Sequence, residues 1–316
     1  MPLDLVRLPA GILLLYFGAE WLVRGSAGFA FAMGMRPLVV GLTIVAYGTS
    51  APELVVSVAA ALEGHSALAL GNVVGSNIAN LGLILGVTAL ISPPAVEKTL
   101  ARREVPILVV TALLCPFLLA DGWIGRVDGA LLLLGAIAFT IWTLRVAAPA
   151  PPPSAESGGG EGRTSRASLL RLIGLAALGL AVLLAGGKVF VDGATGVALA
   201  FGVSERLIGL TIVAIGTSLP EMAASLVAAI RGHPSIAVGN VVGSNIFNML
   251  LILGAAGLVR PIEGSFSVIG FDVGVMVGFT LAGALLLRCE RRISRLEGAL
   301  LVAAYAAFLI TLTRME

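Results

Sequence analysis

Two stretches of this chain are near-copies of each other, and this repetition limits the folds that the chain can adopt. Residues 41–86 read GLTIVAYGTSAPELVVSVAAALEGHSALALGNVVGSNIANLGLILG, and residues 209–254 read GLTIVAIGTSLPEMAASLVAAIRGHPSIAVGNVVGSNIFNMLLILG. The offset is 168 positions without a gap, and 30 of 46 positions are identical. The identities include Glu53 and Glu221, and chance similarity between apolar segments does not preserve such polar positions. The chain therefore contains an internal duplication.

The composition places this duplication in a membrane. Hydrophobic residues make up 58% of the chain, charged residues only 12%, and the mean hydropathy is +1.03. A soluble domain carries about 25% charged residues, and about 20 apolar residues cross a bilayer. The 40 glycines fit the close approach of helices in lipid, and the net charge of +2 is too small to suggest a nucleic-acid partner.

Hydropathy predicts five membrane spans in each half of the chain. Five is an odd number, so two such repeats in series must enter the membrane from opposite sides. We therefore predict an all-α polytopic membrane protein with ten transmembrane helices in two inverted five-helix repeats, residues 1–146 and 169–316. The predicted spans are Leu8–Met33, Pro37–Leu62, Ala67–Ile91, Val105–Ala120 and Val127–Val146, then Leu170–Phe201, Leu207–Ile230, Ser235–Val259, Ile269–Leu287 and Leu296–Leu312.

Between the repeats lies a segment rich in Pro, Gly and Ser, Ala147–Ser168, which we interpret as a flexible linker. If this linker is cytoplasmic, 13 Lys and Arg residues fall on the cytoplasmic side and 5 on the other. Because positive charge concentrates on the inside, both termini are expected outside the cell membrane.

Each repeat brings an acid into an apolar span directly after a proline. Proline breaks a helix, and in lipid the freed carbonyls need partners, so broken helices line sites or cavities. A charged residue at mid-membrane costs at least ~3 kcal/mol, so Glu53 and Glu221 are functional candidates. The breaks are expected to add backbone oxygens and hydroxyls from Ala46, Thr49 and Ser50, and from Ala214, Thr217 and Ser218.

The next span of each repeat supplies amides and a further hydroxyl. Asn72, Ser76 and Asn80 recur every four residues, which places them on one helical face. The second repeat carries Asn240, Ser244 and Asn248 at the same spacing. Carboxylate, hydroxyl, amide and carbonyl oxygens suit Ca²⁺ or Na⁺ rather than zinc or copper. Two ionised glutamates carry the charge that balances one Ca²⁺, or most of the charge on several Na⁺. A site that binds either Ca²⁺ or Na⁺, but not both at once, would make the protein an exchanger.

The paired GTSAPE/GTSLPE and GNVVGSNIAN/GNVVGSNIFN motifs resemble the two alpha repeats of the cation/Ca²⁺ exchanger superfamily, and most closely its prokaryotic sodium/calcium exchanger branch. The resemblance implies that Glu53 and Glu221 bind Ca²⁺ and Na⁺ at the centre of the protein, with the carbonyls of Thr49 and Thr217. It further implies Na⁺ ligation by Ala46, Ser50, Ser76, Ala214, Ser218 and Ser244, with Asn80 and Asn248 at the central site.

The resemblance also limits the expected coupling, location and partners. Some members carry Asp where this chain has Asn248, and K⁺-dependent relatives typically have that acid, so we expect no K⁺ coupling. The linker is too short for the Ca²⁺-sensing domain of eukaryotic relatives. We expect a multi-pass protein of a prokaryotic plasma membrane, with Ca²⁺ and Na⁺ as substrates, and no enzymatic activity, cofactor or obligate protein partner.

Other interpretations of the same residues stay open at this point. The two glutamates would also serve a Ca²⁺/H⁺ antiporter, an intramembrane protease, or a purely structural pairing, and a channel is a further alternative. The protease reading is weak because the usual Gly-rich Asp motif is absent from the sequence. Glu20 with Arg24, and Lys188 with Asp192, are expected to form ion pairs within their helices. Cys115 and Cys289 are expected to be small core residues.

Overall fold

The computed structural model describes residues 2–146, 166–202, 214–264, 266–288 and 292–315, and these residues are almost entirely helical. In the first half the elements are α1 (Pro2–Ala32), α2 (Pro37–Val40), π-helix η1 (Gly41–Val45), α3 (Ala46–Thr49), α4 (Ala51–Glu63), α5 (Ser66–Ala79), π-helix η2 (Asn80–Ile84), α6 (Leu85–Ile91), α7 (Lys98–Leu118), β1 (Trp123–Ile124) and α8 (Arg126–Arg145). In the second half they are α9 (Arg166–Ala200), α11 (Ala214–Thr217), α12 (Leu219–Ile230), α13 (Pro234–Phe247), π-helix η4 (Asn248–Ile252), α14 (Leu253–Val259), β2 (Ile262–Glu263), α15 (Phe266–Arg288) and α16 (Arg295–Met315).

The predicted membrane spans can be compared with these helices. The described residues contain 7 helices long and apolar enough to cross a membrane, or 8 when the bent pair from Pro37 to Glu63 is counted as one span. The predicted span Val105–Ala120 lies largely within α7, which begins earlier, at Lys98. The predicted span Leu207–Ile230 is described only from Ala214 onward, as α11 and α12.

Helix α9 begins at Arg166, so the last residues of the predicted linker Ala147–Ser168 are helical. The rest of the predicted linker, residues 147–165, lies outside the described residues.

Helices in the two halves of the chain begin at positions separated by the same 168 residues as the repeated sequences. The first residues of α5 and α13, of η2 and η4, and of α7 and α15 are each 168 positions apart. The two copies therefore use the same succession of helices over these regions, down to the position of a single π-helical turn.

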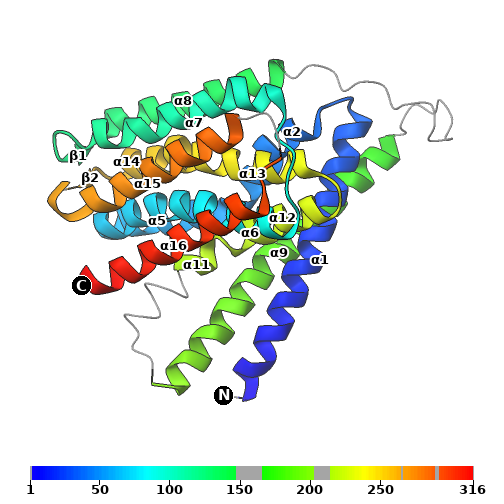
Figure 1. Ribbon diagram of the computed structural model, residues 1–316, viewed down its shortest axis with the longest axis horizontal. Helices are drawn as coiled ribbons and strands as arrows, with labels where there is room; N and C mark the ends of the chain where they lie inside the picture. The colour runs from blue at the N-terminus through cyan, green and yellow to red at the C-terminus, as the bar shows by residue number, and fades with distance from the viewer. Residues whose placement is uncertain (1, 147–165, 203–213, 265, 289–291, 316) are drawn as a thin grey trace.

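Helices α1 and α9 run side by side; they pack against the bundle over part of their length, and their lower ends extend away from it (Figure 1). Three glycines on each helix, seven positions apart, make this contact close. A Cβ on Gly25 would lie 2.5 Å from the backbone nitrogen of Ala176, and one on Gly186 would lie 2.7 Å from that of Leu15. Backbone-to-backbone packing of this kind is typical of helix association in lipid. The glycines are Gly11, Gly18 and Gly25 on α1, and Gly179, Gly186 and Gly193 on α9.

The segments that carry the repeated motif form the centre of the bundle. In the most apolar stretch of Pro234–Val259, 94% of the residues are buried, and in that of Ser66–Ile91 72% are buried. The corresponding share in α9 is only 17%. Peripheral helices expose apolar side chains such as Phe117 and Leu285, as expected of surfaces that face lipid. Within the centre, α4 packs on α5 and α12 on α13, while α13 also packs on α3 and α5 on α11. The two repeats therefore interlock at the motif.

Candidate ion-binding site

The two predicted acids occupy equivalent positions in the core. Glu53 is the third residue of α4 and Glu221 the third residue of α12, and each is 1% exposed. The first turn of a helix has free N–H groups and the positive end of the helix dipole, both of which stabilise a carboxylate. The start of each helix thus provides backbone groups that lower the cost of burying a carboxylate.

The helix breaks lie slightly before the prolines. Pro52 and Pro220 are the second residues of α4 and α12, where a missing N–H removes no helical hydrogen bond. The break itself is at Ser50, and the helical segments before and after it meet at 46°. A Cβ on Gly48 would lie 2.8 Å from the Leu180 side chain, so this glycine serves the close approach of α9.

Hydroxyl groups connect the two acids across the repeats. Ser50 Oγ donates to Glu221 Oε1 at 3.1 Å, and Ser218 Oγ donates to Glu53 Oε1 at 3.3 Å. Ser50 Oγ also lies 3.1 Å from Ser244 Oγ. Each serine at a helix break therefore contacts the acid of the other repeat, which gathers both breaks and both acids at one place.

Two asparagines hold the beginnings of the acid-bearing helices. Asn72 Nδ2 donates to the Glu53 carbonyl at 3.1 Å and to Ser57 Oγ at 2.8 Å. Asn240 Nδ2 repeats this arrangement with the Glu221 carbonyl at 3.3 Å and Ser225 Oγ at 2.9 Å. Asn240 Oδ1 also accepts from Thr49 Oγ1 at 3.2 Å. Through these bonds each amide holds the backbone at the start of an acid-bearing helix.

The central asparagines each begin a π-helical turn. Asn80 is the first residue of η2 and Asn248 the first residue of η4, and both are 1% exposed. π-helical turns within α-helices occur frequently at functional sites. Asn248 Nδ2 donates to Asn77 Oδ1 at 3.1 Å. The repeated spacing predicted the shared face of these side chains but carried no signal for the π turns.

The remaining predicted residues lie around this centre. The Ala46 carbonyl accepts the Ser50 N–H at 3.0 Å, directly after η1. Ser76 and Thr217 line a cavity of about 460 Å³ next to the acids' helices. Ala214 is the first described residue of α11. The structure thus brings most of the predicted ligands together, while their roles as ligands stay a prediction.

Several buried oxygens of this cluster lack a hydrogen-bond partner among the described residues. They are Glu53 Oε2, Glu221 Oε2, Asn80 Oδ1 and Asn248 Oδ1. An unsatisfied buried polar atom costs about 1–3 kcal/mol, and more when it is charged, so native proteins rarely leave several together. Oxygens of this kind are the ligands that a bound cation would provide with a partner.

The two acids of this cluster have no basic partner among the described residues. Within the described ranges no Lys or Arg lies within ion-pair distance of Glu53 or Glu221, and no three His, Cys, Asp or Glu side chains group together. Any cation held here would therefore meet two carboxylates and otherwise neutral oxygens. Such a donor set fits Ca²⁺ and Na⁺ and does not fit a soft transition metal.

One predicted ion pair is wrong and its counterpart is confirmed. Lys188 Nζ lies 3.3 Å from Asp192 Oδ2 within α9, as expected. Glu20, however, pairs with Arg231 at the end of α12, at 2.5 Å, rather than with Arg24. The i,i+4 spacing describes neighbours on one helix only, whereas Arg231 reaches Glu20 from a helix packed alongside. Cys115 is buried as expected, and Cys289 lies outside the described residues.

The comparison of the repeated motifs did not identify two further acids. Glu104 on α7 and Asp272 on α15 are 168 positions apart, and each has a buried oxygen without a hydrogen-bond partner in the described part of the chain. They lie beyond the 46-residue block of high identity, so the comparison of motifs missed them. Extending the same offset along the whole chain would have found them.

Comparison with known proteins agrees with this arrangement. The family described as "Sodium/calcium exchanger protein" matches residues 4–145 and 171–314, on either side of the linker. This chain belongs to the sodium/calcium exchanger family. The exchanger fold is also shown: the solved structure of the sodium-calcium exchanger NCX_Mj superposes with a TM-score of 0.86 at 32% identity, over 98% of this chain and 99% of that chain.

Full-length relatives place this exchanger-family chain among cation/Ca²⁺ antiporters of the membrane. The sodium/calcium exchanger MaX1 of Methanosarcina acetivorans is 33% identical, with 96% of each chain covered. The inner membrane protein YrbG of Escherichia coli is 36% identical, over 99% of this chain and 97% of that protein. The chain is thus a multi-pass membrane antiporter of cations, and its family transports ions rather than transforming a substrate.

Proposed function

We propose that this antiporter exchanges Ca²⁺ for Na⁺ across the cell membrane. The observation that carries the proposal is the cluster around Glu53 and Glu221. Each of the two buried carboxylates accepts a hydrogen bond on one oxygen from a serine of the other repeat. The second oxygen of each carboxylate has no partner among the described residues. Neutral amide and hydroxyl oxygens complete the surroundings.

The charge of the cluster explains why the two ions would compete. Two carboxylates neutralise one Ca²⁺, and the same charge attracts more than one Na⁺. Simultaneous binding of both ions in this small volume would leave excess positive charge in a low-dielectric interior, which is costly. Occupancy by one ion therefore excludes the other, and transport in opposite directions follows.

The proposed carrier alternates between two orientations. In this proposal ten spans form two inverted repeats, residues 1–146 and 169–316, with the linker in the cytoplasm and both termini outside. Inverted repeats allow alternating access by rocking one set of helices against the other around a fixed site. The proposed ligands are those predicted from the repeats, and neither a cofactor nor a partner protein is part of the mechanism.

Relatives support Na⁺ as the coupling ion. MaX1 is named a sodium/calcium exchanger, and NCX_Mj was solved after soaking with Na⁺, Ca²⁺ or Sr²⁺. Coupling to protons through the same two glutamates is the competing mechanism, and the flux experiment below separates the two.

The purified protein in proteoliposomes tests the proposal. An outward Na⁺ gradient at equal pH on both sides should drive uptake of radioactive Ca²⁺, and a Na⁺ ionophore should abolish it. Omitting K⁺ from both sides should leave the uptake unchanged, because Asn248 adds no acid to the site. Uptake driven by a pH gradient but not by Na⁺ would replace the proposed coupling with Ca²⁺/H⁺ exchange.

A further inference from the structure

The two central asparagines differ in how their amide groups are held. Asn248 Nδ2 donates to Asn77 Oδ1 at 3.1 Å, while Asn248 Oδ1 is buried and has no hydrogen-bond partner among the described residues. Both polar atoms of the Asn80 amide lack such a partner in the same part of the chain. Of the two, only Asn248 therefore has its nitrogen distinguished from its oxygen by a described contact.

This distinction matters because the two ends of an amide are alike in size and opposite in partial charge. The oxygen accepts hydrogen bonds or binds a cation, whereas the NH₂ group donates hydrogen bonds and repels a cation. A half-turn of the amide about its last bond exchanges the two ends. An asparagine ligand therefore needs a partner that decides which end faces the ion. For Asn248 this partner is Asn77, which takes the nitrogen and leaves the oxygen free.

Asn77 is itself held in one orientation. Its Nδ2 atom donates to the Sδ atom of Met276 at 3.6 Å, and both side chains are buried. A thioether sulfur only accepts hydrogen bonds, so the amide nitrogen of Asn77, and not its oxygen, must face it. The Asn77 oxygen is thereby left for Asn248. The hydrogen bonds run in one sense, from Asn248 to Asn77 and from Asn77 to Met276, and this sense fixes the Asn248 amide.

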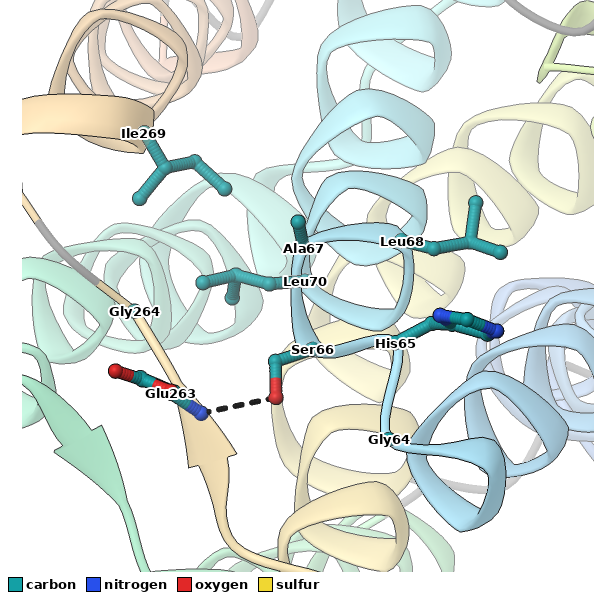
Figure 2. A pocket seen from close by; sticks show the side chains of 9 residues that line it. All are labelled: Gly64, His65, Ser66, Ala67, Leu68, Leu70, Glu263, Gly264 and Ile269. Atoms are coloured by element: carbon teal, nitrogen blue, oxygen red, sulfur yellow. Dashed lines mark hydrogen bonds between the residues drawn. The ribbon is translucent and has the colours of Figure 1, made fainter.

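The packing of α5 against α15 brings Asn77 and Met276 together. Leu70 of α5 and Ile269 of α15 line the same pocket beside β2, as Figure 2 shows. Asn77 and Met276 each lie about two helical turns further along their helices, and so on the same faces as Leu70 and Ile269. The contact between asparagine and methionine thus continues the seam that begins at this pocket.

This chain of hydrogen bonds is not duplicated among the described residues. Leu108 lies at the position equivalent to Met276, 168 residues earlier, and its side chain has no acceptor atom. The counterpart of Asn77 is Asn245, which donates to the Val241 carbonyl of its own helix at 2.7 Å. Its Oδ1 atom has no partner in the described part of the chain. The repeated sequence alone therefore does not produce the contact with a central asparagine.

We propose that Asn77 is a positioning residue that turns the oxygen of Asn248 toward the bound cation. Asn248 begins η4, which packs on α5 and on α4, the helix that carries Glu53. Asn77 directly follows Ser76, one of the predicted ligands. The inference rests on the proposed exchange function, because Asn248 holds an ion only within that proposal. Asn77 acts through Asn248 and does not itself bind the ion.

Two substitutions of Asn77 separate this role from packing. Asn77→Leu keeps the approximate size and removes the acceptor, so Asn248 loses the contact that fixes its amide. Asn77→Asp keeps an acceptor oxygen but places a charge in a buried position. If Asn77 only filled space beside Met276, the buried charge would be the more harmful change. If Asn77 positions Asn248, the apolar leucine is the more harmful one.

Na⁺-driven Ca²⁺ uptake into proteoliposomes would be measured over a range of Ca²⁺ concentrations. We expect Asn77→Leu to raise KM for Ca²⁺ about tenfold, equivalent to about 1.4 kcal/mol, with the maximal rate unchanged, because one neutral ligand atom is lost. Asn77→Asp should not raise KM. In an Asn248→Asp background either carboxylate oxygen can face the ion, so Asn77→Leu should no longer raise KM there. Asn77→Ala also removes the acceptor and replaces Asn77→Leu if that variant does not fold.

Thr280→Val is the control, because Thr280 is buried on α15 and its hydroxyl donates to the Met276 carbonyl at 2.8 Å. This variant should leave KM unchanged. A larger rise in KM for Asn77→Asp than for Asn77→Leu would overturn the inference, and so would a wild-type KM in Asn77→Leu. An undiminished effect of Asn77→Leu in the Asn248→Asp background would overturn it as well. If the wild-type protein shows no Na⁺-driven Ca²⁺ uptake, the proposed function fails instead.

Discussion

At the scale of single residues, the charge of Glu53 is expected to decide Ca²⁺ binding. Glu53→Gln keeps the shape and one carbonyl oxygen but removes one unit charge. At 4 Å and an effective dielectric constant near 20, the attraction between one unit charge and a divalent ion is about 8 kcal/mol, before desolvation offsets most of it. A net loss of ~3 kcal/mol weakens binding more than 100-fold. We predict that Glu53→Gln and Glu221→Gln each nearly abolish Ca²⁺ flux in proteoliposomes while the protein remains folded.

Glu63→Gln is the control for this prediction, because Glu63 ends the same helix with its side chain 69% exposed. Its transport should match the wild type. A well-folded Glu53→Gln protein with normal Ca²⁺ flux would remove this glutamate from the ion site and with it the proposed mechanism.

At the scale of helices, the glycine contact between α1 and α9 is expected to tolerate no side chain. A Cβ on Gly18 would collide with the backbone of Leu183, so both helices would have to move apart. Overpacking of a close contact costs about 1–3 kcal/mol. We predict that Gly18→Ala lowers the melting temperature of the purified protein in detergent. Gly174→Ala on α9 is the control, since a Cβ there meets nothing within 4 Å. Equal melting temperatures of the two variants would contradict the prediction.

At the scale of the whole molecule, the charge bias predicts one orientation in the membrane. A cysteine at position 154 of the linker, in a chain whose two native cysteines are replaced by alanine, should react with an impermeant thiol reagent only after cells are opened. A cysteine near the C-terminus should react in intact cells. Labelling of the linker cysteine in sealed cells would reverse the predicted orientation.

Comparison of the chain with itself was sufficient to predict the repeat, the pair of buried acids and the kinds of oxygen atom around them. The reason is physical: a duplicated fold repeats its buried polar positions at a constant offset, and the spacing of four places Asn, Ser and Asn on one helical face. Hydropathy likewise predicted the long apolar helices that the structure describes, because lipid requires apolar residues over a fixed length.

Only the packed structure decided which groups meet. Ser50 reaches Glu221 and Ser218 reaches Glu53 because the two repeats interlock, and no local spacing encodes contacts between residues so distant in the chain. For the same reason Glu20 pairs with Arg231 and not with Arg24.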